Sequence, residues 1–324
     1  MYVLGARLEI GDKEFRRVHS VEIKKSVKQL QNTAVIKIPT TARLVRSGEF
    51  VTEVETAKAF SVGDECKIYL GYNGNLKEEF RGFVSKIKPQ IPLEIEVDDE
   101  TYLLKRKHLN HSFRKTNLRE VIEYVIAGTG IKLVEEIPDL QFDVFYLKRT
   151  SAANALQKIA KEYGLRIYFS SWMTLYVGIT NENDDTIVKY AMGKNVIKNA
   201  LEWVSEDDIK LKVKAISVRP DNSRIEVEVG DEDGDRRTLW FYNVASKKEL
   251  LIKAKAEIEK YKYSGYKGSM TTFLLPNATP GNVASMEDKD FPERSGDYLI
   301  ESVETKFSER GARRKVELGI KVST

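Results

Sequence analysis

The sequence contains the same pattern twice: a strand led by glycine, followed by a second strand that opens on glycine and an aromatic residue. The first copy has Gly63 before one strand and Gly82 in its partner, and the second copy has Gly281 and Gly296. Glycine is expected where the backbone adopts a positive φ or where two backbones come close. Two such copies, separated by a middle part with helical periodicity, predict two related β-domains in one chain.

Length and charge narrow the class of protein. The chain has 324 residues, enough for two or three domains with their own cores. Its 53 basic and 49 acidic residues nearly balance, so the charge does not indicate a nucleic-acid partner. No apolar run approaches the roughly 18 residues that a membrane span needs, and the N-terminus lacks the pattern of a cleaved signal. We therefore expect no membrane partner and synthesis in the cytoplasm of the host cell. The single cysteine excludes an internal disulfide framework.

The first part of the chain, residues 1–97, has the pattern of half-buried strands. Hydrophobic and polar residues alternate most clearly over residues 65–70 and 91–97. The alternation is lost between residues 40 and 60, where we expect an excursion from the sheet that is partly helical. Residues 1–97 are therefore predicted to form a first β-barrel.

The middle part, residues 98–180, has the periodicity of helices. Asn117 and Glu120 have the spacing of a capping box, which predicts a helix that begins there. Ser151 opens a second helix that Gly164 ends, and two strands in a hairpin are expected after it. These elements predict a small α/β module.

Residues 181–324 return to the alternation of strands. Ser246 and Glu249 form another capping box, which predicts one helix inserted among them. This part is predicted to be a second β-barrel with an inserted helix. The fold class expected from the whole sequence is mainly β with an α+β insertion, in which two tube-like β-barrels flank a small α/β module.

Few residues offer candidate chemistry. His108 and His111 are close enough in sequence to share a metal, but no cysteine or glutamate nearby completes a ligand shell. Cys66 falls on the apolar face of a predicted strand, where a free cysteine is usually a small buried hydrophobic residue and not a nucleophile. Neither feature favours a catalytic or metal site.

An acidic stretch begins at Asp231 and ends at Asp235. A calcium loop that started at Asp231 would need glycine at its sixth place and glutamate at its twelfth, where the chain has Arg236 and Tyr242. A hairpin turn is the simpler interpretation. The sequence therefore predicts no catalytic residue, no metal ligand, no cofactor site and no enzyme activity.

Four segments, taken in order, resemble one family. These segments span nearly the whole chain: 60–65 running into Gly71-Tyr72; 80–84 leading to Pro89 and Asp98; 152–178; and Pro280-Gly281 with 296–303. On these segments the chain is similar to the baseplate or tail hub proteins of contractile-tailed phages, the late control protein D family, and to the hub part of type VI secretion spike proteins. A glycine turn before a strand is common, so the ordered set is what makes the resemblance specific.

The resemblance implies a structural hub of a phage or prophage-derived tail. In that family each chain contributes two tube-like barrels, and a homotrimer forms a ring of six barrels between the sixfold tail tube and the threefold central spike. The implied partners are the tail tube protein and a spike protein, which is expected to be separate because this sequence stops at Thr324, just after the second barrel. The implied location is the baseplate of the virion tail.

Two other classes of function remain as alternatives. A tail-associated cell-wall hydrolase or peptidase would need a catalytic constellation, which the sequence does not display. A carbohydrate-binding or adhesin β-protein would need exposed aromatic residues gathered on one face, which the periodicity does not reveal.

Overall fold

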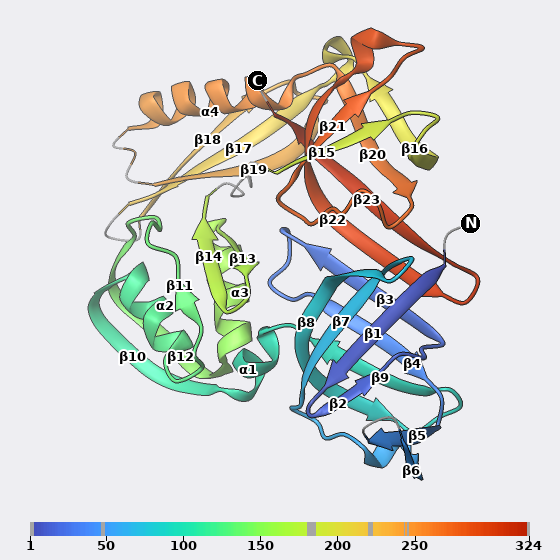
Figure 1. Ribbon diagram of the computed structural model, residues 1–324. Coiled ribbons are helices and arrows are strands. Elements are labelled where there is room, and N and C mark those ends of the chain that lie inside the picture. Colours follow the sequence, from blue (N-terminus) through green and yellow to red (C-terminus); the bar gives the residue numbers. More distant parts are fainter. Residues whose placement is uncertain are drawn as a thin grey trace.

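The computed structural model describes residues 3–46, 49–179, 186–219, 223–242, 244 and 246–322. Its strands form two β-repeats that share one sheet, with an α/β module and a smaller sheet covered by one helix beside them (Figure 1). The fold class expected from the sequence, mainly β with a small α/β part, is confirmed.

The first repeat is the blue to teal part of Figure 1. Its strands pair in the order β3-β4-β9-β8-β7-β1, and the short β2 (Lys13–Phe15) extends the edge beyond β1. All of these neighbours are antiparallel. The strands are β1 (Leu4–Ile10), β3 (Ser20–Ser26), β4 (Thr33–Ile38), β7 (Glu65–Tyr72), β8 (Asn75–Lys88) and β9 (Leu93–Asp98).

The second repeat has the same arrangement. Its strands pair in the order β16-β20-β23-β22-β21-β15, so each strand has a counterpart in the first repeat at the same place in the sheet and in the chain. One direction differs, because β15 runs parallel to β21 whereas β1 runs antiparallel to β7. The strands are β15 (Ile187–Ala191), β16 (Val196–Val204), β20 (Gly265–Thr272), β21 (Val283–Glu287), β22 (Gly296–Ser308) and β23 (Gly311–Lys321).

The glycine that leads each copy makes the same backbone bonds. Gly63 has φ +101° and its N–H donates to the carbonyl of Val84 at 2.8 Å. Gly281 has φ +97° and its N–H donates to the carbonyl of Ile300 at 2.9 Å. A positive φ is costly for any residue with a Cβ, so both positions call for glycine. The sequence pattern therefore corresponds to a structural repeat.

The second pair of glycines is not equivalent in the structure. Gly82 lies opposite Cys66 in the ladder, and the residue at that place in the second repeat is Tyr298, two residues after Gly296. A Cβ on Gly82 would lie 2.2 Å from the carbonyl oxygen of Asp98, so close backbone approach accounts for this glycine. The expected match between Gly82 and Gly296 is wrong by two residues.

A shared irregularity strengthens the equivalence of the repeats. The ladder between β8 and β9 shifts its register between Val84 and Lys86. The ladder between β22 and β23 shifts in the same way between Ile300 and Ser302. Because a β-bulge is a defined local feature, its recurrence at matching positions aligns the two repeats residue by residue.

The two repeats are joined into one sheet of thirteen strands. The second half of β22 pairs antiparallel with β3, from Ser302 opposite Ser26 to Ser308 opposite Ser20. We call this pairing the cis joint. Phe307 and Ala312, at the end of the β22–β23 hairpin, pack into the hydrophobic core of the first repeat. The repeats are therefore held together by backbone bonds and by a shared core.

A buried ion pair lies beside the cis joint. Arg314 of β23 is fully buried and its Nη2 lies 2.6 Å from Oε1 of Glu79 in β8, which is also buried. Its Nη1 donates to the carbonyl of Pro276 at 3.0 Å. Glu79 is the extra residue where the β7–β8 register shifts, which turns its side chain toward Arg314.

The α/β module follows β9 and has its own core. The expected helices are confirmed: Asn117 caps α2 by accepting from the N–H of Glu120, and Ser151 caps α3, which ends at Gly164 with φ +63°. Beside them the structure adds α1 and a long antiparallel ribbon of β10 with β12. The elements are α1 (Thr101–Arg106), β10 (His108–Asn117), α2 (Leu118–Ile126), β11 (Lys132–Leu133), β12 (Gln141–Ser151), α3 (Ala152–Tyr163), β13 (Arg166–Ser171) and β14 (Thr174–Gly178).

Each repeat carries a different insertion. Between β4 and β7 the first repeat has a hairpin, β5 (Thr41–Arg46) with β6 (Glu49–Glu55), and then one 3₁₀ turn (Thr56–Lys58). The expectation of a partly helical excursion holds only for that turn, because most of the segment is strand.

The second repeat carries its insertion between β16 and β20. A sheet of three strands, which we call the inserted sheet, has the order β18-β17-β19 and is covered by α4 (Lys247–Tyr261). Its strands are β17 (Leu211–Val218), β18 (Arg224–Gly230) and β19 (Asp235–Tyr242). The expected hairpin between the last two is wrong, because β17 lies between them and pairs with both.

We expect Gly63→Ala and Gly281→Ala each to lower the free energy of unfolding by about 1 to 3 kcal/mol, because a side chain is strained at a φ near +100°. Gly296→Ala is the control. Its φ is not positive and its nearest neighbour is the flexible end of Lys321, so a change within about 0.5 kcal/mol is expected. Urea unfolding measures all three, and an equal cost at Gly296 would contradict the assignment.

Arg314→Met is expected to lower the free energy of unfolding by about 3 to 5 kcal/mol, because it leaves the buried Glu79 carboxylate without its partner. Adding Glu79→Gln should recover part of that loss, since the double variant buries no unpaired charge. Arg310→Met, at an exposed turn of the same hairpin, is the control. Strictly additive costs in the double variant would show that the pair does not act as a unit.

Candidate functional site

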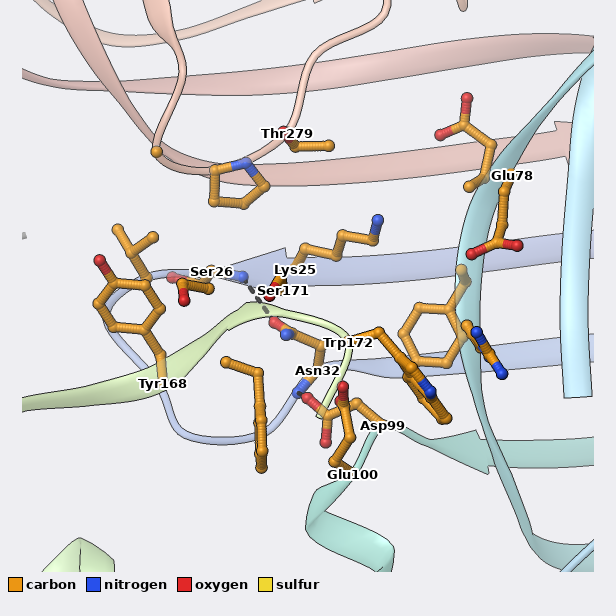
Figure 2. Close-up of a pocket in the computed structure, with 18 residues that line it drawn as sticks. Lys25, Ser26, Asn32, Glu78, Asp99, Glu100, Tyr168, Ser171, Trp172 and Thr279 are labelled. Carbon is orange, nitrogen blue, oxygen red and sulfur yellow. Dashed lines mark hydrogen bonds between the residues drawn. The ribbon is translucent and has the colours of Figure 1, made fainter. Parts of the chain in front are cut away.

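Several buried ionisable residues line a pocket where three parts of the molecule meet. This junction pocket has a volume of about 610 Å³. The first repeat supplies Lys25 and Glu79. The β13–β14 hairpin of the α/β module supplies Trp172, and the loop before β21 supplies Thr279 (Figure 2). Asp99 and Glu100, which follow β9, form its floor in the same view.

Asp99 is fixed by three hydrogen bonds at the point where the chain leaves the first repeat. Its Oδ2 accepts from the N–H of Asn32 at 2.7 Å, and its Oδ1 accepts from the N–H of Thr101 at 3.0 Å and from Oγ1 of the same residue at 2.6 Å. Burial raises the pKa of this carboxyl to about 7, although the hydrogen bonds from Thr101 and Asn32 oppose the shift. Asp99 therefore links the β3–β4 turn to the start of α1.

Two further charged groups face the junction pocket. Oε1 of Glu100 accepts from the N–H of Met173 at 2.7 Å, which ties the first repeat to the turn of the β13–β14 hairpin, and burial raises the pKa of Glu100. Burial lowers the pKa of Lys25, while Glu79 opposes that shift. Glu100 therefore links the first repeat to the α/β module.

Aromatic contacts also hold the β13–β14 hairpin against β8. The guanidinium of Arg81 lies 4.1 Å from the ring centre of Trp172. Phe83 stacks on Trp172 with ring centres 5.7 Å apart, and on Tyr102 at 5.5 Å. Stacking and cation–π contacts of this kind stabilise a partly buried interface. The α/β module is thus packed firmly against the first repeat.

The arrangement of the junction pocket fits a structural joint better than a catalytic centre. A perturbed pKa in a pocket is a recognised sign of an active site. Here, however, Asp99 and Glu100 accept backbone N–H groups and Glu79 is paired with Arg314, so all three carboxylates take part in contacts within the protein. No histidine or cysteine is among the residues that line this pocket. The pocket therefore lacks the side chains of the commonest catalytic and metal-binding arrangements.

The structure places the sequence candidates apart. His111 stacks on Tyr124 with ring centres 4.6 Å apart and so belongs to an aromatic cluster on β10 and α2, whereas His108 lies at the start of β10 opposite Ser151. Cys66 is fully buried in the core of the first repeat, and burial raises its pKa to about 12. In the described part of the chain, no group of three or more His, Cys, Asp or Glu side chains could hold a metal ion.

The acidic stretch makes local bonds. Asp231 Oδ2 accepts from the N–H of Leu211 at 3.1 Å and lies 3.3 Å from Nζ of Lys262. Asp233 pairs with Lys210 at 2.5 Å. These bonds fix the turn that leads from β18 to β19, which explains the acidic residues without a bound cation.

The fold defined by these elements is found in phage tail proteins and in a secretion-system component. The chain is similar to the 43 kDa tail protein of prophage MuSo2 from Shewanella oneidensis, with a TM-score of 0.62, 16% identity and 98% of each chain covered. It is similar to a tail protein from Neisseria meningitidis MC58, with a TM-score of 0.63, 14% identity and 99% and 97% covered.

A third similar structure is the E. coli c3393 protein, with a TM-score of 0.60, 11% identity and 98% of this chain and 77% of that chain covered. That protein is described as a component of the type VI secretion system with structural similarity to the T4 tail proteins gp27 and gp5. No protein-family model and no curated protein matches the chain by sequence. The resemblance to tail hub proteins is therefore confirmed at the level of the fold.

Among the described residues, no helix is both long and apolar enough to cross a bilayer.

Asp99 should make stability depend on pH. Its pKa is raised to about 7 in the folded state, so its contribution is complete below its unfolded value near 3.8 and is lost as the pH rises through 7. The difference in free energy of unfolding between the wild type and Asp99→Asn should therefore shrink as the pH rises from about 4 to about 7. Urea unfolding at several pH values measures this difference, and a difference that grows with pH would contradict the assignment.

Proposed function

We propose that this chain is the structural hub of a phage or prophage-derived tail, and that three copies form a pseudo-sixfold ring that joins the tail tube to the central spike. The observation that carries the proposal is the internal repeat: six strands with the same order, the same leading glycine and the same bulge occur twice and are joined edge to edge. Two near-equivalent units in each of three chains give six similar positions around one axis.

The partners follow from the same proposal. A ring whose strands repeat six times matches a sixfold tube, and its threefold composition matches a trimeric spike. We therefore propose the tail tube protein and a separate spike protein as partners, and the baseplate of the virion tail as the location. The domain division at 1–97, 98–180 and 181–324 belongs to this proposal. The division is supported by three hydrophobic cores, one centred in each repeat and one in the α/β module, of which the core of the first repeat also includes Phe307 and Ala312.

The proposed role is not enzymatic. Support comes from the junction pocket, where the carboxylates are bound within the structure, and from similar structures that are named as tail proteins. A tail-associated cell-wall hydrolase or peptidase is the alternative from another class. No arrangement described above favours it.

The mass of the purified protein in solution tests the ring. We expect a particle of three times the 37.0 kDa of one chain, measured by light scattering over a range of concentrations. A monomer at every concentration, alone and with its tail tube and spike proteins, would overturn the ring.

Incubation with peptidoglycan and with casein tests the alternative. We expect no release of fragments above buffer, because no histidine or cysteine lines the junction pocket and its buried carboxylates are bound within the protein. Turnover that disappears in Glu100→Gln would favour the hydrolase instead.

A further inference from the structure

The cis joint occurs once in the chain, although the repeat that forms it occurs twice. It uses the β22 edge of the second repeat and the β3 edge of the first. The matching edges, on β8 of the first repeat and on β16 of the second, are not used in the cis joint. The ladder between β7 and β8 ends near Val84, so the rest of β8 has no strand on that side. β16 stands at one end of the thirteen-stranded sheet, so it has a partner strand on one side. No described strand pairs with either of these edges.

The repeat fixes which residues are equivalent at the two edges. Lys86 occupies the place of Ser302, since each follows the shared bulge in its ladder. Across the sheet, Leu201 lies in line with Ile300, through Gly268 and Leu318. Ile23 lies in line with Val84 in the same way, through Ala34 and Val97. Because Ile300 and Val84 are equivalent, Leu201 occupies the place of Ile23. The register of the cis joint can therefore be transferred to the two free edges.

The transferred register brings complementary side chains together. Ile87 falls opposite Trp203, on the face that carries the cores, and Lys88 falls opposite Glu202 on the other face. In the cis joint the latter position pairs Glu304 with Lys24, also opposite charges. Within the chain, Lys88 forms an ion pair with Glu94 at 2.7 Å. The exposed Lys86 lies on the same face of β8 as Lys88, so it would bring a second positive charge to the face that carries Glu202.

Residues at the two free edges are more exposed than their counterparts in the cis joint, as expected if a partner strand is absent. Five of the nine residues of β16 are exposed, whereas one of the seven residues of its counterpart β3 is exposed. Ile91, at the tip of the β8–β9 hairpin, is 91% exposed, whereas Phe307, near the tip of the equivalent hairpin, is 6% exposed because it enters the core of the first repeat.

A cavity lies where Ile91 would arrive. β8 ends at Lys88, and the tip of the hairpin that carries Ile91 continues beyond it in the direction of Asn199 on the opposite edge. Asn199 lines a cavity of about 310 Å³ at the end of the second repeat, where Ile197 and Leu201 supply apolar surface and Asp288, Asp290 and Arg294 supply polar surface. Burial of an isoleucine that is almost fully exposed is a favourable contribution to association.

We propose that the β8 edge at Lys86–Lys88 pairs antiparallel with the β16 edge of a second copy of this chain, in the register of the cis joint, and that Ile91 enters the second repeat of that copy. We call this contact the trans joint. It rests on the proposed ring and names the surfaces that close it. Because the two edges are different, the contact is head-to-tail, which is the type that generates rings.

Strand addition at free edges explains the sequence of the β8–β9 hairpin. An unpaired strand edge can pair with edges of other molecules and so promote aggregation. Pro89 limits the length of any ladder on the β8 edge, because proline has no N–H to donate. A short ladder with one apolar anchor is sufficient for a specific contact, because backbone bonds supply affinity and the anchor sets the register.

Engineered disulfides test the register. In the cis joint the N–H of Val27 donates to the carbonyl of Glu301, so Ser302–Ser26 and every second pair after it, including Glu304–Lys24, lack reciprocal hydrogen bonds. Such pairs have Cα atoms about 4.5 Å apart, which a disulfide can bridge. The trans joint makes Lys88–Glu202 a pair of this type. The variant Lys88→Cys with Glu202→Cys should therefore form disulfides between chains, seen as trimers on a denaturing, non-reducing gel.

Two matched variants control this experiment. Lys24→Cys with Glu304→Cys should close a disulfide within one chain and leave monomers on the same gel. Lys77→Cys with Glu202→Cys uses an exposed residue of β8 far from the proposed register and should give no cross-linked trimer. Cys66 stays in all variants, because it is buried.

The outcomes separate this proposal from the proposed function. A trimer in solution whose Lys88→Cys, Glu202→Cys variant forms no disulfide between chains would overturn the trans joint and leave the ring in place. Disulfide-linked chains of unlimited length would support the trans joint and overturn the closed trimer. A monomer at every concentration, alone and with its tail tube and spike proteins, would overturn both. As a second measurement, Ile91→Asp should weaken association of the wild-type chain at least tenfold, and an unchanged association would contradict the role of Ile91.

Discussion

Backbone pairing between β22 and β3 is the interaction on which the arrangement of the molecule depends. It merges two repeats into one sheet, carries Phe307 into the core of the neighbouring repeat, and brings Arg314 next to Glu79. A buried charge pair is a weak source of net stability, since desolvation offsets much of the attraction, but it penalises any other relative placement of the repeats because that would leave a buried charge alone. The ladder supplies the attraction between the repeats, and the ion pair makes one placement specific.

The junction pocket shows how ionisable residues can serve architecture. Asp99 and Glu100 have the raised pKa values that often accompany catalysis, yet the cause is burial at a meeting point of three parts of the chain. Their oxygens accept backbone N–H groups from Asn32, Thr101 and Met173, which belong to different segments. The same carboxylates therefore form hydrogen bonds that connect the first repeat to the α/β module.

Much of this fold could be predicted from local patterns, and the parts that could not have a common physical reason. Helix caps at Asn117 and Ser151, and the glycines at 63 and 281, are determined by a few neighbouring residues, so the sequence displays them. The merging of the sheets and the placement of β17 between β18 and β19 depend on contacts between distant segments. One signal was available: in the alternation of β23, Arg314 occupies an inward position otherwise held by Ala312, Val316 and Leu318. A charge at such a position indicates a buried partner from elsewhere in the chain.

The insertions in the two repeats differ, and this has a consequence for stoichiometry. The first repeat carries the β5–β6 hairpin, while the second carries the inserted sheet and α4 at another place in its strand order. In the proposed ring, a ligand protein that contacts only features common to both repeats would bind in six copies. One that contacts α4 or the β5–β6 hairpin would bind in three. Counting bound copies would therefore reveal which surface a given neighbour recognises, before any contact is mapped at the level of residues.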